Sequence, residues 1–227
     1  MTFSLHPADA AVPAGSHSAT VVIEPALTNR NRLTCAFRPI LAIPHAILVG
    51  APTALGITLG WRLREDLNAD WGAGTGVLGL LAGVVAFIAW FAILFTGEYP
   101  RGLWQLAAFY LRWRTRAMAY MALLRDEYPP FGDADYPAHV DLAMPEGPRD
   151  RVTTAFRIFM LIPHFILLWL LSVIWLLTSI VAWLAILFTG RFPASLYQFG
   201  CGVLRWSVRV EAYLLLLHDE YPPFALE

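Results

Sequence analysis

The chain has 227 residues, of which 58% are hydrophobic and only 15% carry a formal charge. A soluble domain usually has about 45–50% apolar and about 25% charged residues, so this composition points to a lipid environment. The net charge of -1 excludes the global basic field of a nucleic-acid-binding protein, and the spacing of the two cysteines suggests no disulfide framework.

The first segments of the chain are polar or short. Residues 1–18 are rich in Ala, Pro, Ser and His and lack the apolar run of a cleavable signal peptide, so a loose tail is expected. Residues 19–24 then alternate between the two faces of an extended chain, as residues 138–143 do later. This period of two predicts short strands, and we expect the two strands to pair with each other.

The sequence is a tandem duplication. The segment LTCAFRPILAIPH at residues 33–45 returns as VTTAFRIFMLIPH 119 residues later, and residues 89–131 return 93 residues later as residues 182–224. The smaller second spacing means that copy one contains an insertion, which is an extra polar loop at about residues 60–76. The predicted organisation is a tail (1–18), repeat one (19–131), a linker (132–137) and repeat two (138–227).

Both copies contain apolar segments long enough to cross a membrane. In copy one, residues 39–59 and 77–95 flank the polar loop and are expected to be two crossings, since roughly 20 apolar residues span the hydrocarbon core. In copy two, residues 158–188 would extend about 46 Å as a helix, which is too long for one upright crossing. Arginines flank both ends of this segment, which favours a re-entrant hairpin with both ends in the cytoplasm over one long helix.

Each copy ends with a helix of mixed character, at about residues 101–125 and 194–218. The residues that the two helices share recur at spacings of three and four, which places them on one face; in copy one they are Arg112, Arg116, Ala119 and Leu123. An apolar helix with arginine and tryptophan is typical of the membrane interface. Two arginines one turn apart suit the phosphate of a lipid, or alternatively ion pairs with acids near the helix ends, Asp126, Glu127, Asp219 and Glu220. The residues expected to contact lipid or a partner are Arg112, Trp113, Arg116, Arg205, Trp206, Arg209 and, at the helix entrances, Arg38 and Arg157.

His45 and His164 are equivalent positions, and each follows a proline in an apolar segment. An ionisable residue within a membrane segment is a candidate functional site, and a neutral imidazole can ligate the metal of a haem or pigment. The structural interpretation is a hydrogen bond to a backbone carbonyl freed by Pro44 or Pro163. One histidine per copy favours this second interpretation, so no cofactor and no metal site is expected.

The repeated motifs resemble a known family. Phe-Arg, Ile-Pro-His, Ala-Ile-Leu-Phe-Thr-Gly, Leu-Arg-Trp and Asp-Glu-Tyr-Pro-Pro-Phe occur in the same order in both copies, at about residues 19–131 and 138–224. This pattern is similar to the bacterial membrane family catalogued as domain of unknown function 4389. The resemblance implies a bacterial inner-membrane protein and no particular chemistry, and the extra loop of copy one departs from the compact pattern of the family.

These observations predict a mainly α-helical integral membrane protein, built from two units of short strand, transmembrane hairpin and interfacial amphipathic helix. Because the sequence has no catalytic signature, we expect a non-enzymatic scaffold or accessory subunit of a bacterial inner-membrane complex. It would be multi-pass, with termini and interfacial helices in the cytoplasm, and its partners would be membrane lipids and other subunits.

Two alternatives remain open at this point. A small lipid or solute transporter would have a central site at the repeat interface. Such a site predicts a cavity lined by Arg112, Arg116, Arg205 and Arg209. A pigment- or haem-binding subunit would use His45 and His164, and it predicts a visible absorption band.

Overall fold

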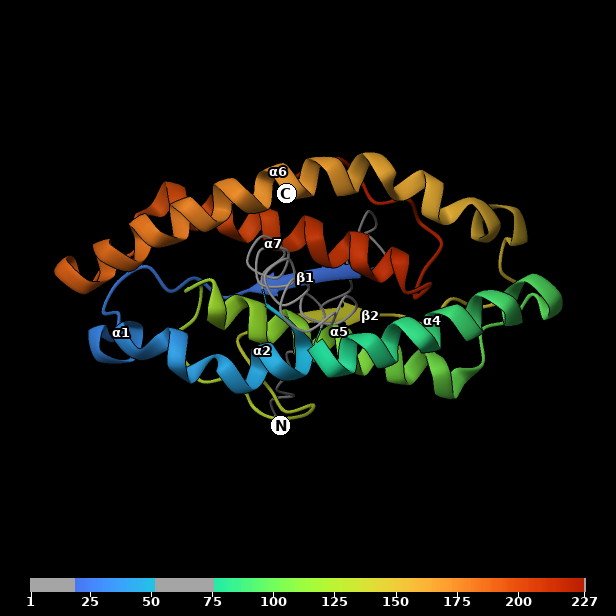
Figure 1. Cartoon of the computed structure of the whole chain (residues 1–227), viewed down its shortest axis with the longest axis horizontal. Coiled ribbons are helices and arrows are strands. Elements are labelled where there is room, and N and C mark those ends of the chain that lie inside the picture. Colours follow the sequence, from blue (N-terminus) through green and yellow to red (C-terminus); the bar gives the residue numbers. More distant parts are fainter. Residues whose placement is uncertain (1–18, 52–75, 227) are drawn as a thin grey trace, which may run out of the picture.

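The computed structural model describes residues 19–51 and 76–226 and consists mainly of helices (Figure 1). The predicted tail and most of the predicted polar loop lie outside the described residues. The elements, in chain order, are β1 (Ala19–Ile23), α1 (Arg32–Leu41), α2 (Ile43–Val49), α4 (Gly76–Thr96), α5 (Arg101–Met121), β2 (Ala138–Leu142), α6 (Arg151–Thr189) and α7 (Ala194–Leu214).

β1 and β2 form a two-stranded antiparallel sheet, as the alternating patterns predicted. In its register Val21 faces Val140, and these two residues occupy equivalent positions in the two copies. The sheet therefore relates the copies by an approximate twofold axis. β1 packs on α7 of copy two, and β2 packs on α5 of copy one, so that each strand covers the helix of the other copy.

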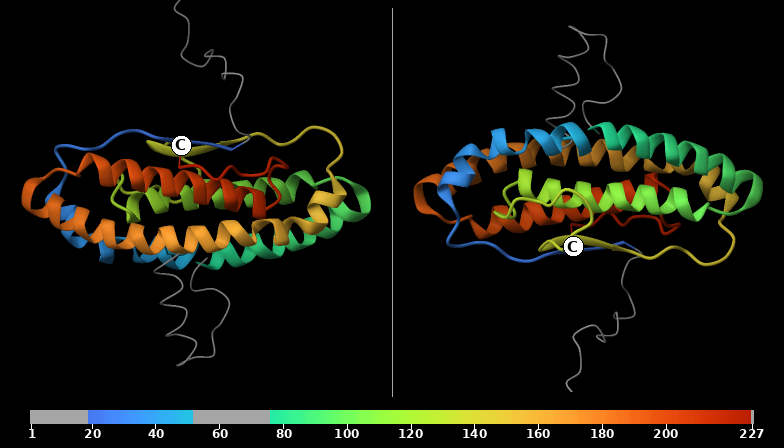
Figure 2. Two further views of the ribbon diagram at one scale, coloured as in Figure 1. Left: turned by 90° about the horizontal axis from the view of Figure 1, so that it is seen from above. Right: turned by 90° about the horizontal axis from the view of Figure 1, so that it is seen from below.

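The elements are arranged in three layers (Figure 2). The outer layer contains α1, α2 and α4 in one row and α6 in the other, the middle layer contains α5 and α7, and the sheet lies on the opposite side. Most residues of α5 and α7 are buried. The structure thus corrects the expected position of these two helices at a membrane interface: they form the interior of the molecule, because other segments cover their Arg-bearing faces.

Residues 158–188 do not form the predicted re-entrant hairpin. They belong to α6, which is one continuous helix of 39 residues. The side chain of Asp150 caps its N-terminus, and Gly190 ends it in the left-handed conformation with φ of 69°. Pro163 is the only proline inside it, and one proline removes a single hydrogen bond without reversing the chain. A hairpin needs turn residues at its centre, and the sequence around Ser172 has none.

Copy one has a broken helix where copy two has the first part of α6. α1 and α2 meet at a bend of 44°. Pro39 lies inside α1, and Pro44 lies in the first turn of α2. Copy two has a proline only at the position of Pro44, which is Pro163, and its helix is continuous there. The additional Pro39 of copy one therefore accounts for the break. The described part of the predicted crossing 39–59 is therefore a bent pair of helices that ends at Gly50.

α4 and α6 are each long and apolar enough to cross a membrane, and the α1–α2 pair is a third candidate if it is counted as one span. α4 lies alongside α6 in the outer layer, and α1 contacts the other end of α6 (Figures 1 and 2). The outer layer is thus formed by both copies together.

Two equivalent hydrogen bonds tie the copies at the ends of the molecule. The backbone N–H of Arg30 donates to the carbonyl of Gly190 at 3.0 Å, and that of Arg149 donates to the carbonyl of Gly97 at 2.8 Å. In each case a linker between strand and helix bonds to the turn that follows an outer helix of the other copy. The two copies are therefore interlocked rather than placed side by side.

Candidate functional site

A buried arginine lies at the C-terminal end of the middle helix in each copy. Arg38 of α1 donates to the carbonyl of Tyr120 at 2.9 Å and to that of Arg125, and its guanidinium lies 4.1 Å from the centre of the Tyr120 ring. Arg157 of α6 contacts the carbonyl and ring of Tyr213 at the same two distances. The last carbonyls of a helix lack partners within the helix, and a cation there opposes the negative end of the helix dipole. Each arginine therefore caps the middle helix of its own copy.

A carboxylate and a second arginine complete each cap. Asp126 accepts hydrogen bonds from Arg30 and Arg38, and Asp219 accepts them from the equivalent pair of copy two, with closest distances of 2.7 Å throughout. Burial alone raises the pKa of Asp126, but the hydrogen bonds and charge of its two arginines outweigh burial and hold this pKa below its usual value. The carboxylate therefore stays ionised and neutralises part of the buried positive charge.

These contacts leave the two predicted entrance arginines buried, since Arg38 and Arg157 are each only 2% exposed. Their guanidinium groups are directed at protein partners rather than at a headgroup. The partner arginines of the caps, Arg30 and Arg149, were not predicted as site residues from the sequence. A signal was present, because Arg-Asn-Arg at residues 30–32 and Arg-Asp-Arg at residues 149–151 extend the repeated motif upstream.

Each histidine of the Ile-Pro-His motif lies in a box of aromatic rings. Nδ1 of His45 accepts a hydrogen bond from the indole N–H of Trp113 at 3.2 Å, and the imidazole stacks on Phe131 with 4.7 Å between ring centres. The corresponding distances in copy two are 3.1 Å and 4.0 Å, and its residues are His164, Trp206 and Phe224. Both histidines are fully buried.

The hydrogen bond from tryptophan assigns the proton of each imidazole. An indole N–H can only donate, so Nδ1 accepts and the neutral ring carries its proton on Nε2. A metal at Nε2 would require the proton on Nδ1, where the tryptophan now donates. Each histidine is thus bonded at Nδ1 to a tryptophan, a partner that was not predicted from the sequence. Among the described residues, no group of three or more His, Cys, Asp or Glu could hold a metal.

The arginines of the predicted lipid-contact face lie against protein partners. Arg116 and Arg112 both pair with Asp133, at 2.7 Å and 3.2 Å, and Arg209 donates to the carbonyl of Ala225 at 2.8 Å. Ion pairing was one of the two expected uses of Arg112 and Arg116, but their partner lies in the loop after α5 rather than among the four acids proposed. The other residues of this face are half-buried or buried: Arg205, Trp113 and Trp206.

A central ion pair between α5 and α7 was not identified from the sequence. Arg114 donates to the carboxylate of Glu211 at 2.8 Å and also to the carbonyl of Val49, and the hydroxyl of Tyr110 donates to Glu211 at 3.0 Å. The internal repeat cannot reveal this pair, because copy two has Ser207 at the position of Arg114. The pair joins α2, α5 and α7 at the centre of the molecule.

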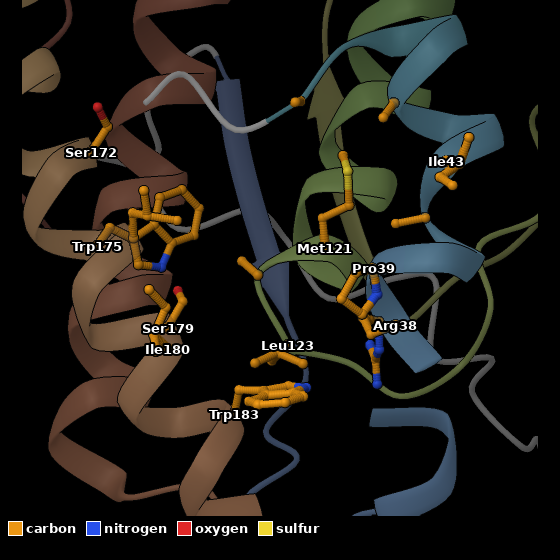
Figure 3. A pocket seen from close by; sticks show the side chains of 15 residues that line it. Arg38, Pro39, Ile43, Met121, Leu123, Ser172, Trp175, Ser179, Ile180 and Trp183 are labelled. Carbon is orange, nitrogen blue, oxygen red and sulfur yellow. The ribbon is translucent and has the colours of Figure 1, made fainter. Parts of the chain in front are cut away.

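Two apolar clefts lie between the outer helices. Cleft A, of about 560 Å³, is formed by α1, α2, the end of α5 and the second half of α6 (Figure 3). Cleft B, of about 360 Å³, is formed by α4, the first half of α6 and the end of α7. Equivalent residues of the two copies line them: Arg38, Leu123, Ser179 and Trp183 in cleft A, and Arg157, Leu216, Ala86 and Trp90 in cleft B.

A tryptophan closes one side of each cleft. The indole N–H of Trp183 donates to the carbonyl of Cys35, and that of Trp90 donates to the carbonyl of Thr154, both at 2.9 Å. Each bond crosses from one copy to the other, so the clefts are features of the interlocked copies.

The fold and these sites define a class of helical protein in which two interlocked copies share arginine-capped helices and an apolar outer layer. The family described as "Domain of unknown function (DUF4389)" matches residues 72–132 and 151–225, which is one segment in each copy. The chain belongs to this family, as its repeated motifs indicated. No curated protein and no solved structure matches it.

Proposed function

We propose that this protein is a non-catalytic membrane scaffold whose outer helices lie in the hydrocarbon, roughly parallel to the membrane plane, while the sheet faces water. The observation that carries this proposal is the apolar surface of the outer layer. Large apolar side chains are exposed along all of α6, from Val152 (68%) to Phe188 (78%), and along α4, from Val77 (59%) to Phe95 (77%). Water-soluble monomers rarely expose a contiguous apolar surface of this extent.

The opposite face supports an in-plane orientation. Exposed carboxylates lie within the two strands or a few residues from them in the chain, and they are Glu24, Asp133, Asp135, Asp141 and Glu146. An upright orientation would bury these charges in lipid, which is costly. α6, at about 58 Å, is also about twice the thickness of the hydrocarbon core.

The curvature of the outer helices supports the same orientation. Both rows bow away from the sheet in Figure 2, so both ends of each row lie nearer to the sheet side than its middle does, and the ends would lie near the membrane surface. In this orientation the arginines at both ends of α6 need no hairpin, and the proposal differs in this respect from the multi-pass crossings expected from the sequence. Exposed arginines at the ends of the rows would lie among headgroups, and they are Arg32, Arg101, Arg151 and Arg191.

The proposed location is the cytoplasmic side of a bacterial inner membrane. Arginine-rich ends favour the cytoplasmic face, and the family resemblance implies a bacterial membrane. There the acidic sheet side would be available to other subunits of a complex, as expected of a scaffold or accessory subunit.

The alternative functions receive less support. Neither cleft A nor cleft B is lined by Arg112, Arg116, Arg205 or Arg209, so neither is the cavity predicted for a transporter. A pigment or haem would need the imidazole nitrogen geometry that the two tryptophans oppose. A visible absorption band in the gently purified protein would reinstate the pigment-binding alternative.

Labelling of the two ends of α6 tests the orientation. We would place single cysteines at Arg151 and Arg191 in a chain whose buried Cys35 and Cys201 are changed to Ala, and label spheroplasts and inverted vesicles with a membrane-impermeant maleimide. Both cysteines are expected to react with the maleimide in inverted vesicles, and neither is expected to react in spheroplasts. Labelling from opposite sides would refute the in-plane orientation, and extraction of the chain by alkaline carbonate would refute embedding itself.

A further inference from the structure

We infer that clefts A and B are two equivalent phospholipid sites, each holding one acyl chain, with the lipid phosphate at an exposed arginine, Arg32 for cleft A and Arg151 for cleft B. The inference rests on the proposed function, because the lipids would enter from the surrounding bilayer. It moves the lipid contact from the buried arginines of the middle helices to the ends of the outer helices.

The lining of the clefts selects hydrocarbon. In cleft A the hydroxyl of Ser172 already donates to the carbonyl of Trp169 at 2.8 Å, and the indole N–H of Trp183 is bonded to copy one. The guanidinium of Arg38 is directed at helix carbonyls and at Asp126. A polar ligand would therefore find few free partners, whereas an acyl chain needs none.

The position of the clefts gives access from lipid. Residues at their rims are exposed on the apolar face: Ile43 (51%) and Ile180 (50%) for cleft A, and Phe87 (63%) and Ile158 (61%) for cleft B. An apolar cavity does not hold water well, because a buried water needs two to four polar partners. The volumes of both clefts fall within the range of about 300–1,000 Å³ that is usual for ligand pockets.

An exposed cation lies beyond each cleft, at the end of the two helices that form its walls. Arg32 precedes Pro39 of cleft A by seven residues, and its guanidinium lies over Gly190, which follows Trp183 by seven residues. Seven helical residues correspond to about 10 Å. A phosphate at Arg32 would thus be within reach of a chain that enters the cleft, and a guanidinium is a favourable phosphate partner.

Copy two repeats this arrangement. Arg151 precedes Ile158 of cleft B by seven residues, and its guanidinium lies over Gly97, which follows Trp90 by seven residues. In both turns a Cβ on the glycine would lie only 3.3 Å from the arginine side chain, so glycine allows the close approach. The recurrence of an apolar cleft with an exposed arginine at its end is what points to one lipid per copy.

The decisive experiment fills cleft B. Gly83 lines this cleft, and a Cβ added there meets no atom within 4 Å, so Gly83→Phe projects a ring into the cleft, while Gly83→Ala is the matched control with the same loss of glycine. The full chain would be reconstituted with equal parts of phosphatidylglycerol and phosphatidylcholine, released from the bilayer gently, and analysed by native mass spectrometry. We expect two retained phospholipids in the wild type and in Gly83→Ala, and one in Gly83→Phe.

A second variant tests the phosphate contact without changing the cleft. Arg151→Gln should weaken retention of one phospholipid by about tenfold, since a charge-assisted hydrogen bond contributes about 1.5 kcal/mol or more. Equal retention in Gly83→Phe, Gly83→Ala and Arg151→Gln would overturn the inference. If the wild type remains in carbonate-washed membranes but retains no stoichiometric lipid, only the lipid sites are refuted, whereas a chain released by carbonate refutes the proposed function as well.

Discussion

Replacement of Asp126 by Asn should destabilise the protein by about 3 kcal/mol, because this carboxylate holds together the cap of copy one. Asp126 accepts two hydrogen bonds from Arg30, one from Arg38 and one from the backbone N–H of Asn31. An asparagine offers one acceptor oxygen and turns an N–H₂ group toward a guanidinium, which also donates. The substitution therefore removes both a charge and about half of the acceptor capacity.

The magnitude follows from the burial of the partners. The side chains of Arg30 and Arg38 are 1% and 3% exposed, so neither guanidinium can replace the carboxylate by water. Removal of one member of a buried ion pair typically costs about 3–5 kcal/mol. The side chain of Asp126 is itself 22% exposed, which places the expected loss at the lower end of that range.

The assay is the free energy of unfolding in mixed micelles, titrated with sodium dodecyl sulfate and followed by tryptophan fluorescence. Asp133→Asn is the matched control, because Asp133 also pairs with two arginines but its side chain is 43% exposed. An exposed pair contributes about 0–1 kcal/mol. If Asp126→Asn destabilises the chain no more than Asp133→Asn does, the cap is not the structural centre of copy one.

Two further substitutions have defined outcomes in the same assay. Burial, assisted by the charge of Arg157, lowers the pKa of His218 to about 4, so the unfolded chain binds a proton first as the pH falls. The contribution of His218 to the free energy of unfolding should be fully present above about pH 6.5, and about 2 kcal/mol of it should be lost between pH 6.5 and pH 5. A His218→Gln variant that kept this slope would contradict the assignment. Trp206→Phe removes the donor to the buried Nδ1 of His164 and should lower the free energy of unfolding by about 1–3 kcal/mol. The control is Trp169→Phe, at a side chain that is 50% exposed, which should change it by less than about 0.5 kcal/mol. Equal effects would exclude a structural role for the histidine box.

Local patterns were sufficient for much of the fold. Period-two alternation located β1 and β2, and the repeat indicated that they pair. The starts of α5 and α7 agree with the predicted residues 101 and 194, and each helix ends about four residues early because Leu123 and Leu216 adopt the left-handed conformation, with φ of 64° and 63°. Hydrogen bonds across this turn close both helices before the double proline is reached.

The predictions that failed concern side chains and helices whose position depends on residues distant in the sequence. The stripe of Arg112 and Arg116 looks amphipathic in the sequence, but Asp133 folds back over it, and no spacing rule reveals a partner in a loop. The flanking arginines of α6 were interpreted as evidence for a hairpin, because a helix was assumed to cross the membrane upright. In the in-plane orientation proposed above, both ends of the continuous helix α6 would lie on one side without any turn.

The self-pairing of β1 and β2 around Val21 and Val140 is the arrangement expected where two separate, identical subunits meet on a twofold axis. In these terms the chain is a tethered homodimer, and fusion releases its halves from the requirement to be identical. The ion pair of Arg114 and Glu211 uses this freedom, because Ser207 and Met118 stand at the equivalent positions. A dimer of identical chains would bring either two arginines and two methionines or two serines and two glutamates to that centre, so it could not form this pair. Covalent duplication thus allows one salt bridge to lie beside the axis and makes the two halves chemically distinct.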